Sequence, residues 1–414
     1  MIAGTTKTKN YMSKNNPFPI DKDVIKQIRS ELNISSLATC TIRQIVQLVN
    51  RLQEMYSIEF IRTEMGVPGL NAPEAAKEAE IQAIRNGVVS IYPPIEGIQP
   101  LKQELSRFAK LFMDISIDPE GCIPTVGSMQ SSFVTFMVAN RRDKEKDTTL
   151  FIDPGFPVHK RQIAVQGMKY EQFDIYNYRG KKLREKLESY LKKGNISTFL
   201  YSNPNNPSWI CLTDNELKII GELADKYDVV VMEDLAYFGM DFREDYGKPG
   251  MPPFQPTVAK YTHNYVLLFS SSKIFSYAGQ RIGSLLISDK LFHKRFPDLR
   301  KIFNTDQFGL AILQDAIYAS TAGTSHSPQA ALAEMLRLVN RGDYNFVEVL
   351  KEYEKRASVM KKLFVDNGFQ LVYDKDEDKD LADGFYFTIS YPGMGGEELL
   401  EKLIRNGISA ITLD

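Results

Sequence analysis

The middle of the chain alternates between two hydrophobic patterns, and this alternation narrows the folds that it can adopt. Between residues 122 and about 287, short apolar runs of strand length are separated by stretches with helical periodicity. Such a pattern is typical of a largely parallel sheet with helices on both faces. We therefore predict an α/β fold, in which a large domain holds a mostly parallel sheet between helices. The expected strands are residues 149–152, 169–173, 198–201, 229–232, 266–269 and 283–287.

The regions on either side of this alternating part predict further domains. We expect an N-terminal arm and helix over residues 1–62 that packs on a small domain, a large domain over 63–302, and a smaller α+β domain over 303–414. The charged run 374–380 lies between two strand candidates, and we expect it to be a solvated loop. Helices are expected over residues 41–56, 74–86, 101–112, 214–226, 329–339, 346–365 and 396–406, and the late strands over 370–373 and 385–390.

Composition excludes several classes of protein. Lys and Arg number 51 against 52 Asp and Glu, so no global charge favours nucleic acid or an anionic membrane. The three cysteines are far apart and lack CxxC spacing, which argues against a disulfide framework or a metal site and favours a reducing cytoplasm. Residues 1–17 have no apolar core, and no later run approaches membrane length. A small-molecule function fits these observations best.

Polar and aromatic residues follow the ends of four predicted strands. They lie in the segments 153–157, 202–208, 233–237 and 270–273. In open α/β sheets, ligands bind beyond the carboxyl ends of the strands. The sequence therefore predicts a binding site that these four segments share.

Lys273 carries the most chemical information among these residues. It follows the apolar run 265–269 and three serines, and Arg281 comes eight positions later. A lysine at the rim of a buried sheet can be desolvated, which lowers its pKa and makes the neutral amine available as a nucleophile. Taken alone, Lys273 fits better as a lysine that extends to solvent from a strand end, and Arg281 without Lys273 fits better as half of a surface ion pair.

Several motifs in order resemble one enzyme family. Asn-Pro-Asn-Asn-Pro-Ser at 203–208, Asp-Leu-Ala-Tyr at 234–237 and Ser-Ser-Ser-Lys at 270–273, followed by Arg281, resemble the aspartate-aminotransferase-like enzymes of class I and II. These enzymes have the type I fold and use pyridoxal 5'-phosphate. The resemblance extends over roughly residues 60–390. It implies that 63–302 is the cofactor-binding domain.

The resemblance implies roles for the residues at the strand ends. Lys273 would form the Schiff base with the cofactor and then move a proton at the substrate α-carbon. Asp234 would pair with the ring nitrogen and keep it protonated. Without the resemblance, Asp234 is a possible turn cap, and Glu233 is a weaker alternative because neighbours along a strand point to opposite faces.

Three more residues match positions around the cofactor ring. Asn206 and Tyr237 match the donors to the phenolic oxygen of the ring, and Phe156 matches the aromatic residue that stacks on it. Read without the resemblance, Asn206 is a turn residue before a proline, and the two aromatic residues are ordinary core or half-buried side chains.

The cofactor phosphate requires N–H donors and a cation. The segment of Gly127, Ser128 and Met129 reads as a loop that enters a helix, where backbone N–H groups meet a positive dipole end. The resemblance adds Ser270 and Arg281 to this set. It also matches Tyr92 to a tyrosine that reaches the phosphate of the neighbouring subunit, which implies a homodimer with shared active sites.

Two positions depart from the family pattern. Trp209, the only tryptophan, stands where the family usually has glycine, and its ring either narrows the substrate pocket or packs under the loop. The family arginine that binds the substrate α-carboxylate lies beyond a segment like 385–390, where this chain has only Arg405. Either the small domain is incomplete at its end, without a final strand, or the chain has diverged from the family here.

The expected function is an aminotransferase that moves an amino group from an amino acid to a 2-oxo acid. A lyase, a decarboxylase or a racemase would use the same Lys273, Asp234 and Arg281, because the bond placed perpendicular to the ring decides the reaction. A non-catalytic amino-acid sensor is the remaining alternative. We expect a cytoplasmic protein with small-molecule partners, and no binding to nucleic acid or membrane.

Overall fold

The chain forms two compact units in a computed structural model that describes residues 17–382 and 384–413. The larger unit consists of Pro68–Ser358 and Tyr373–Phe387, and the smaller unit of the described parts of Met1–Val67, Val359–Val372 and Thr388–Asp414. This division differs from the expected boundaries at residues 63 and 303. The helix α13 (His326–Arg341) belongs to the larger unit because its apolar face packs on α3 (Glu74–Arg85) and α4 (Gln99–Met113). Periodicity predicts such a helix without showing which unit it covers.

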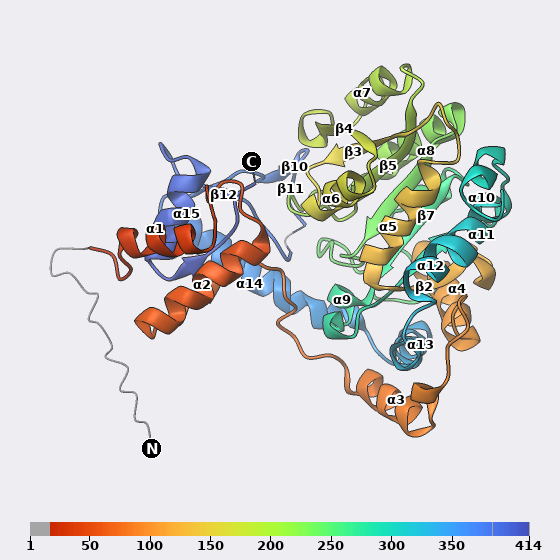
Figure 1. Cartoon of the computed structure of the whole chain (residues 1–414), viewed down its shortest axis with the longest axis horizontal. Coiled ribbons are helices and arrows are strands. Elements are labelled where there is room, and N and C mark those ends of the chain that lie inside the picture. The colour runs from red at the N-terminus through yellow and green to blue at the C-terminus, as the bar shows by residue number, and fades with distance from the viewer. Residues whose placement is uncertain (1–16, 383, 414) are drawn as a thin grey trace. The chain divides into compact units, whose positions relative to one another are not determined.

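The larger unit is built on a seven-stranded sheet with the strand order β2-β8-β7-β6-β5-β3-β4. Figure 1 shows strands of this sheet, among them β5 and β7, surrounded by helices of the unit. β8 runs antiparallel to both of its neighbours, and the other pairs are parallel, so the predicted mostly parallel sheet is confirmed. β2 was not expected as a strand; it contains Pro124, which lacks an N–H and is tolerated because β2 lies at the edge. The strands are β2 (Cys122–Val126), β3 (Thr148–Asp153), β4 (Lys169–Asp174), β5 (Ile196–Ser202), β6 (Val230–Leu235), β7 (Tyr265–Ser270) and β8 (Ile282–Ile287).

Helices cover both faces of this sheet, which explains the continuous apolar runs of its strands. Along β7, Leu267 and Phe269 belong to one buried cluster, whereas Val266 and Leu268 belong to another. The helices of the unit are α3 (Glu74–Arg85), α4 (Gln99–Met113), α5 (Gly127–Ala139), α6 (Pro157–Val165), α7 (Lys182–Leu191), α8 (Asp214–Tyr227), α9 (Ser271–Ile274), α10 (Asp289–His293), α11 (Phe308–Leu310), α12 (Tyr318–Thr321), α13 and most of α14 (Phe346–Asp366).

The smaller unit has its own hydrophobic core. Buried residues of the two N-terminal helices pack with Leu400 and Ile404 of the last helix. Of the predicted strand 385–390, only the last two residues pair, because 385–387 lie in the larger unit. The elements are α1 (Lys22–Glu31), α2 (Ile42–Tyr56), β1 (Ile61–Arg62), β9 (Gln370–Leu371), β12 (Ile389–Ser390), α15 (Gly396–Arg405) and β13 (Ile408–Ser409). β1 pairs with β13, and β9 with β12.

The charged run 374–380 is exposed except at Asp376, as its composition predicts, but it is not an irregular loop. It forms a small hairpin of β10 (Lys375–Asp376) and β11 (Lys379–Asp380). Asp376 is only 5% exposed, and its carboxylate forms ion pairs with Arg179 and Arg243. Two guanidinium groups offset the cost of burying this carboxylate. Both lie far away in sequence, so the local pattern could not reveal them.

Two further observations concern the described residues as a whole. None of the helices that the structure describes is both long and apolar enough to cross a bilayer. No cluster of three or more His, Cys, Asp or Glu side chains within residues 17–382 and 384–413 is arranged to hold a metal ion.

Candidate active site

Three parallel strands bring the main predicted residues to one edge of the sheet. β5, β6 and β7 are neighbours, and the register places Asp234 of β6 opposite Ser202 of β5 and Leu268 of β7. Lys273 follows β7 on the short helix α9, whose first residue is preceded by Ser270 as N-cap. The Ser270 Oγ accepts the N–H of Ser272 at 3.3 Å. The prediction of a shared site beyond the carboxyl ends of the strands is consistent with this arrangement.

Lys273 lies in an environment that favours its neutral amine. Burial, and to a smaller extent the positive charge of Arg281, lower the pKa of Lys273 to about 8. Relative to an ordinary lysine, such a shift raises the neutral fraction at pH 7 roughly 300-fold. The Nζ atom lies 5.1 Å from the ring centroid of Phe385. The side chain therefore meets the chemical requirement of an amine nucleophile.

Asp234 is a buried carboxylate with one backbone hydrogen bond and one distant ion-pair contact. One oxygen accepts the N–H of Ala236 at 3.0 Å, so Asp234 does cap the turn after β6. Burial raises its pKa to about 7. Among the described residues, its ion-pair contact is His159, whose Nε2 lies 3.9 Å from Oδ2. A carboxylate in this position would be stabilised by a cationic ligand group.

His159 also belongs to this site, although the sequence did not predict it. It is 4% exposed, burial lowers its pKa to about 4, and its Nδ1 has no hydrogen-bond partner in the described part of the chain. A neutral imidazole beside Asp234 adds no charge that would satisfy the carboxylate. The available signal was its spacing: His159 lies three residues after Phe156, in the first turn of α6, where such residues share a face.

Glu233 faces away from Asp234, as the alternation along a strand requires. It is fully buried, and one of its oxygens accepts hydrogen bonds from the Thr257 hydroxyl at 2.5 Å and the Val258 N–H at 3.2 Å. Burial raises the pKa of Glu233 to about 7. Glu233 therefore holds the segment of Thr257 and Val258 against β6 and does not share the environment of Asp234.

Asn206 and Tyr237 lie together, as the sequence predicts. The Asn206 amide donates to the Tyr237 hydroxyl at 3.1 Å, and the Asn206 N–H donates to the Ser202 Oγ at 3.0 Å. Tyr237 is 4% exposed, and its pKa is raised above its ordinary value, mainly by burial. The phenol therefore stays protonated and can donate a hydrogen bond to an oxyanion.

The N-terminus of α5 and Arg281 form a tightly packed group. Gly127 has φ +65°, and a Cβ there would lie 2.6 Å from the Arg281 Nη2. A Cβ on Gly283 would lie 2.7 Å from the Ser128 N. No side chain caps the first turn of α5, which leaves N–H groups available for an anion. The segment differs from the predicted loop in one respect, because β2 passes directly into the helix.

Three other predicted residues lie around this edge of the sheet. The Met129 carbonyl accepts the Gln162 amide at 2.8 Å, which ties α5 to α6. Phe156 precedes α6, and its ring stands at 89° to that of His159, with centroids 5.6 Å apart. Tyr92 is 90% exposed in the loop after residues 88–90, so it packs on little of its own chain.

The structure shows the contacts of Trp209 and Arg405, the two residues at the departures from the family pattern. Trp209 is buried, its indole N–H donates to the Met240 carbonyl at 3.2 Å, and its ring packs against Gly384 and Tyr237. It therefore packs under the loop. Arg405 lies in the last turn of α15, where its guanidinium is 3.8 Å from the Phe18 ring and donates to the Ile20 carbonyl at 3.3 Å. Within its own unit, this arginine holds the N-terminal segment.

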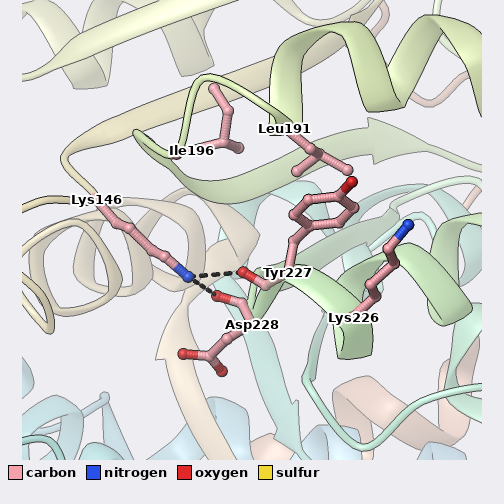
Figure 2. Close-up of a pocket in the computed structure, with 7 residues that line it drawn as sticks. Lys146, Leu191, Ile196, Lys226, Tyr227 and Asp228 are labelled. Carbon is pink, nitrogen blue, oxygen red and sulfur yellow. Dashed lines mark hydrogen bonds between the residues drawn. The ribbon is translucent and has the colours of Figure 1, made fainter.

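A polar hollow at the other edge of the sheet has a structural explanation (Figure 2). It lies near the start of β5 and the end of α8, away from the carboxyl ends of the strands. Lys146 donates to the carbonyls of Tyr227 at 2.6 Å and Asp228 at 3.2 Å, as Figure 2 shows. A cation at a helix C-terminus satisfies carbonyls that lack helical partners. We therefore assign this lysine to the packing of α8.

Comparison with known proteins supports the reading of the strand-end motifs. Residues 64–376 match the family described as aminotransferase class I and II. The chain is 23% identical over 366 residues to the probable aspartate aminotransferase of Methanocaldococcus jannaschii, covering 87% of each protein. It is 24% identical over 374 residues to the aromatic-amino-acid aminotransferase 2 of Thermococcus litoralis, covering 88% of this chain and 84% of that protein.

Solved structures agree in fold. A double mutant of the Thermus thermophilus aspartate aminotransferase has a TM-score of 0.70 at 18% identity, covering 89% of this chain and 87% of that one. The chain therefore belongs to the class I and II aminotransferases, and it is an enzyme that transfers nitrogenous groups. Enzymes of this family use pyridoxal 5'-phosphate. The predicted family, fold class and enzyme class are confirmed.

Proposed function

We propose that the protein binds pyridoxal 5'-phosphate at Lys273 and transfers the amino group of an amino acid to a 2-oxo acid. One observation carries the proposal. Asp234 lies near the end of β6, Lys273 follows the adjacent parallel strand β7, and burial shifts the pKa of each side chain toward neutrality. When bound, the cofactor supplies an electron sink for negative charge at the substrate α-carbon. Lys273, as a neutral amine, would take and return the proton at that carbon.

The other residues would hold and orient the cofactor. Asp234 would carry the negative charge that keeps the ring nitrogen protonated, while Asn206 and Tyr237 would donate hydrogen bonds to the ring oxygen. Phe156 would pack on the ring face. The N–H groups of Gly127, Ser128 and Met129, the Ser270 hydroxyl and the Arg281 guanidinium would bind the phosphate; this donor set suits an anion.

A homodimer with shared active sites belongs to the same proposal. Apolar side chains around α3 are exposed, and so is Tyr92. The exposed apolar residues are Ile81, Ile84, Val89 and Ile91. A second copy of the chain would cover this face and receive Tyr92 at its phosphate group. Mixing Tyr92→Ala with Lys273→Ala subunits tests this: hybrid dimers contain one intact site and should regain activity, whereas independent sites would stay inactive.

The cytoplasm is the compartment that we propose. Cys40, Cys122 and Cys211 are all free thiols in the structure. Free cysteines are stable where the thiol pool is reducing. The proposal would fail if fractionation of the native cells placed the protein outside the cytoplasm.

Two measurements test the catalytic proposal. Borohydride reduction of the protein loaded with pyridoxal 5'-phosphate should fix the cofactor on Lys273, as read by peptide mass mapping. Lys102 is a matched internal control, because it is also buried but donates to the carbonyls of Glu96, Glu120 and Cys122. Modification of Lys102 instead of Lys273 would contradict the assignment.

The second measurement separates transamination from other reactions. A single amino acid added to the loaded protein should yield one equivalent of its 2-oxo acid and leave the amino group on the cofactor. A second 2-oxo acid should then recover the amino group. Release of free ammonia would indicate a lyase, and no reaction with any amino acid would favour the sensor alternative.

A further inference from the structure

Four aromatic side chains of the larger unit form a wall beside Lys273. Phe385 lies closest, with its ring centroid 5.1 Å from the lysine Nζ. Its ring is 5.3 Å from that of Tyr386 and 6.0 Å from that of Tyr237. Tyr386 in turn contacts Tyr237 at 5.7 Å, and Trp209 contacts Tyr237 at 5.1 Å. We call Trp209, Tyr237, Phe385 and Tyr386 the aromatic wall.

The segment that carries half of this wall is fixed to the larger unit by ion pairs. Asp376 joins Arg179 and Arg243, and its carboxylate also accepts the Cys211 N–H at 3.0 Å. Arg243 donates a further bond to the Asp380 carbonyl at 2.9 Å. Asp376 is 5% exposed, so water screens these contacts poorly. The ion pairs anchor the start of the segment Tyr373–Phe387.

The tip of the segment is fixed by close packing. The Phe242 N–H donates to the Ala382 carbonyl at 3.4 Å. A Cβ on Gly384 would lie 1.9 Å from the Trp209 ring, so only glycine allows the chain to approach the indole so closely. Phe385 follows directly, and its ring also packs on Tyr353, with centroids 4.7 Å apart. Contacts at both ends of the segment Tyr373–Phe387 therefore hold Phe385 and Tyr386 in place.

The position of the wall has a consequence for the substrate. The α-carbon of an amino donor must come within proton-transfer reach of the Lys273 amine. Its side chain would then lie within contact distance of Phe385. The guanidinium groups of Arg179 and Arg243, which hold the same segment, are already paired with Glu216, Asp241 and Asp376. Trp209 and Tyr237 are buried and support the wall from behind, so the partly exposed Phe385 and Tyr386 are the aromatic faces that a substrate can meet.

We infer that the aromatic wall makes the enzyme select amino donors with apolar or aromatic side chains over aspartate and glutamate. The inference rests on the proposed function and names its substrate class. Aromatic faces gain free energy from burying apolar groups, whereas a carboxylate placed against them loses hydration, and the described arginines that hold this segment, Arg179 and Arg243, are already paired. Phe385 is the residue that we assign as the main determinant of this preference.

The test uses the protein loaded with pyridoxal 5'-phosphate and a panel of leucine, methionine, phenylalanine, aspartate and glutamate. The rate of 2-oxo acid formation in single turnover gives kcat/KM for each donor. We expect the best apolar donor to exceed both acidic donors by about 100-fold or more. If aspartate or glutamate is preferred, the inference fails and the proposed function stands; if no amino acid reacts, in this panel or beyond it, the proposed function itself fails.

Variants of the wall separate selection from catalysis. Phe385→Ala should lower kcat/KM for phenylalanine and leucine by about tenfold to 100-fold, mainly through KM, and should change that for alanine less than about threefold. Phe385→Leu keeps an apolar side chain and should retain the order of donors. Equal losses for every donor in Phe385→Ala would show a structural role only and would overturn the assignment. Far-ultraviolet circular dichroism and cofactor content confirm that each variant is folded.

Asp376→Asn tests the anchor without touching the wall. Asn keeps the shape and the contact with the Cys211 N–H but removes the charge that the two arginines share. We expect the preference for apolar over acidic donors to fall by about tenfold, because a displaced segment no longer presents Phe385 to the substrate. An unchanged preference would contradict the role of this anchor.

Discussion

The two sides of Lys273 are built in different ways. On the side of Arg281, the group that suits a phosphate depends on backbone: a glycine at φ +65°, the first N–H groups of α5 and the close approach of Gly283 to Ser128. On the other side, the aromatic wall consists of side chains from distant parts of the sequence. Backbone donors would bind the cofactor phosphate, which is the same for every substrate. Side chains, in contrast, can differ between enzymes that act on different substrates. The comparison predicts that damage to the first side lowers all reactions equally.

Lys273 lies between the two sides, and its loss should have the largest effect. Lys273→Ala removes the amine that would hold the cofactor and move the proton, so kcat should fall by at least about 10⁴-fold. The residues that would bind the cofactor phosphate are unchanged in this variant, so noncovalent binding of the cofactor should persist. Single-turnover formation of 2-oxo acid measures the rate, and dialysis equilibrium measures the binding. Retention of more than a hundredth of the activity would contradict the assigned role.

Asp234 should make the stability of the cofactor-free protein depend on pH. Burial raises its pKa to about 7 in the folded state, whereas an unfolded aspartate titrates near 4. As pH rises from about 4 to 7, the unfolded chain releases this proton and the folded chain keeps it, so the free energy of unfolding falls. Three pKa units correspond to about 4 kcal/mol.

The variant Asp234→Asn isolates this effect. Glu233 also titrates with a shifted pKa, but it faces away from Asp234, is present in both proteins and cancels in the difference. His159 contacts Asp234, but its pKa of about 4 keeps it neutral in the folded state over most of this range. Urea unfolding at pH 4 to 8 should therefore show the wild type losing stability relative to Asp234→Asn, and the difference should shrink when the cofactor is bound. Parallel curves for the two cofactor-free proteins would contradict the prediction.

The sequence predicted one side of the site better than the other, for a physical reason. Lys273, Arg281, Asp234 and Asn206 each lie just beyond or near a strand end, and strand ends can be recognised from local hydrophobic patterns. Asp376 could not be recognised, because its burial depends on Arg179 and Arg243, which lie 197 and 133 residues away in the sequence. The same holds for Phe385, which looked like part of a strand and instead packs in the larger unit. Contacts between distant segments leave no period in the local sequence.

Gly127→Ala tests the backbone side of the comparison. The new Cβ would lie 2.6 Å from the Arg281 Nη2 and would displace this guanidinium, so cofactor affinity should fall by about 100-fold for all donors alike. Gly167→Ala is a matched control: its φ is +67°, against +65° at Gly127, and no atom lies within 4 Å of the added Cβ. Both variants should lose about 1 kcal/mol of stability from backbone strain. Equal cofactor affinity in the two variants would show that the displacement of Arg281 does not affect cofactor binding, and it would contradict the prediction.

Tyr237 combines two roles, because its hydroxyl meets Asn206, which would bind the cofactor ring oxygen, and its ring belongs to the aromatic wall. Tyr237→Phe keeps the ring and removes one hydrogen bond, which is worth about 1 kcal/mol, so kcat should fall about fivefold to tenfold. The order of amino donors should stay the same, since the apolar face of the wall is intact.

Tyr353→Phe is the control for this variant. Its hydroxyl accepts the Gly69 N–H at 3.0 Å, so the substitution also removes one phenolic hydrogen bond, and its ring also packs on Phe385. It should leave kcat within about twofold. A change in donor order in Tyr237→Phe would mean that the hydroxyl, and not the ring, selects the substrate. Tyr237 would then contribute both to cofactor binding, which is the same for every donor, and to the choice of the donor.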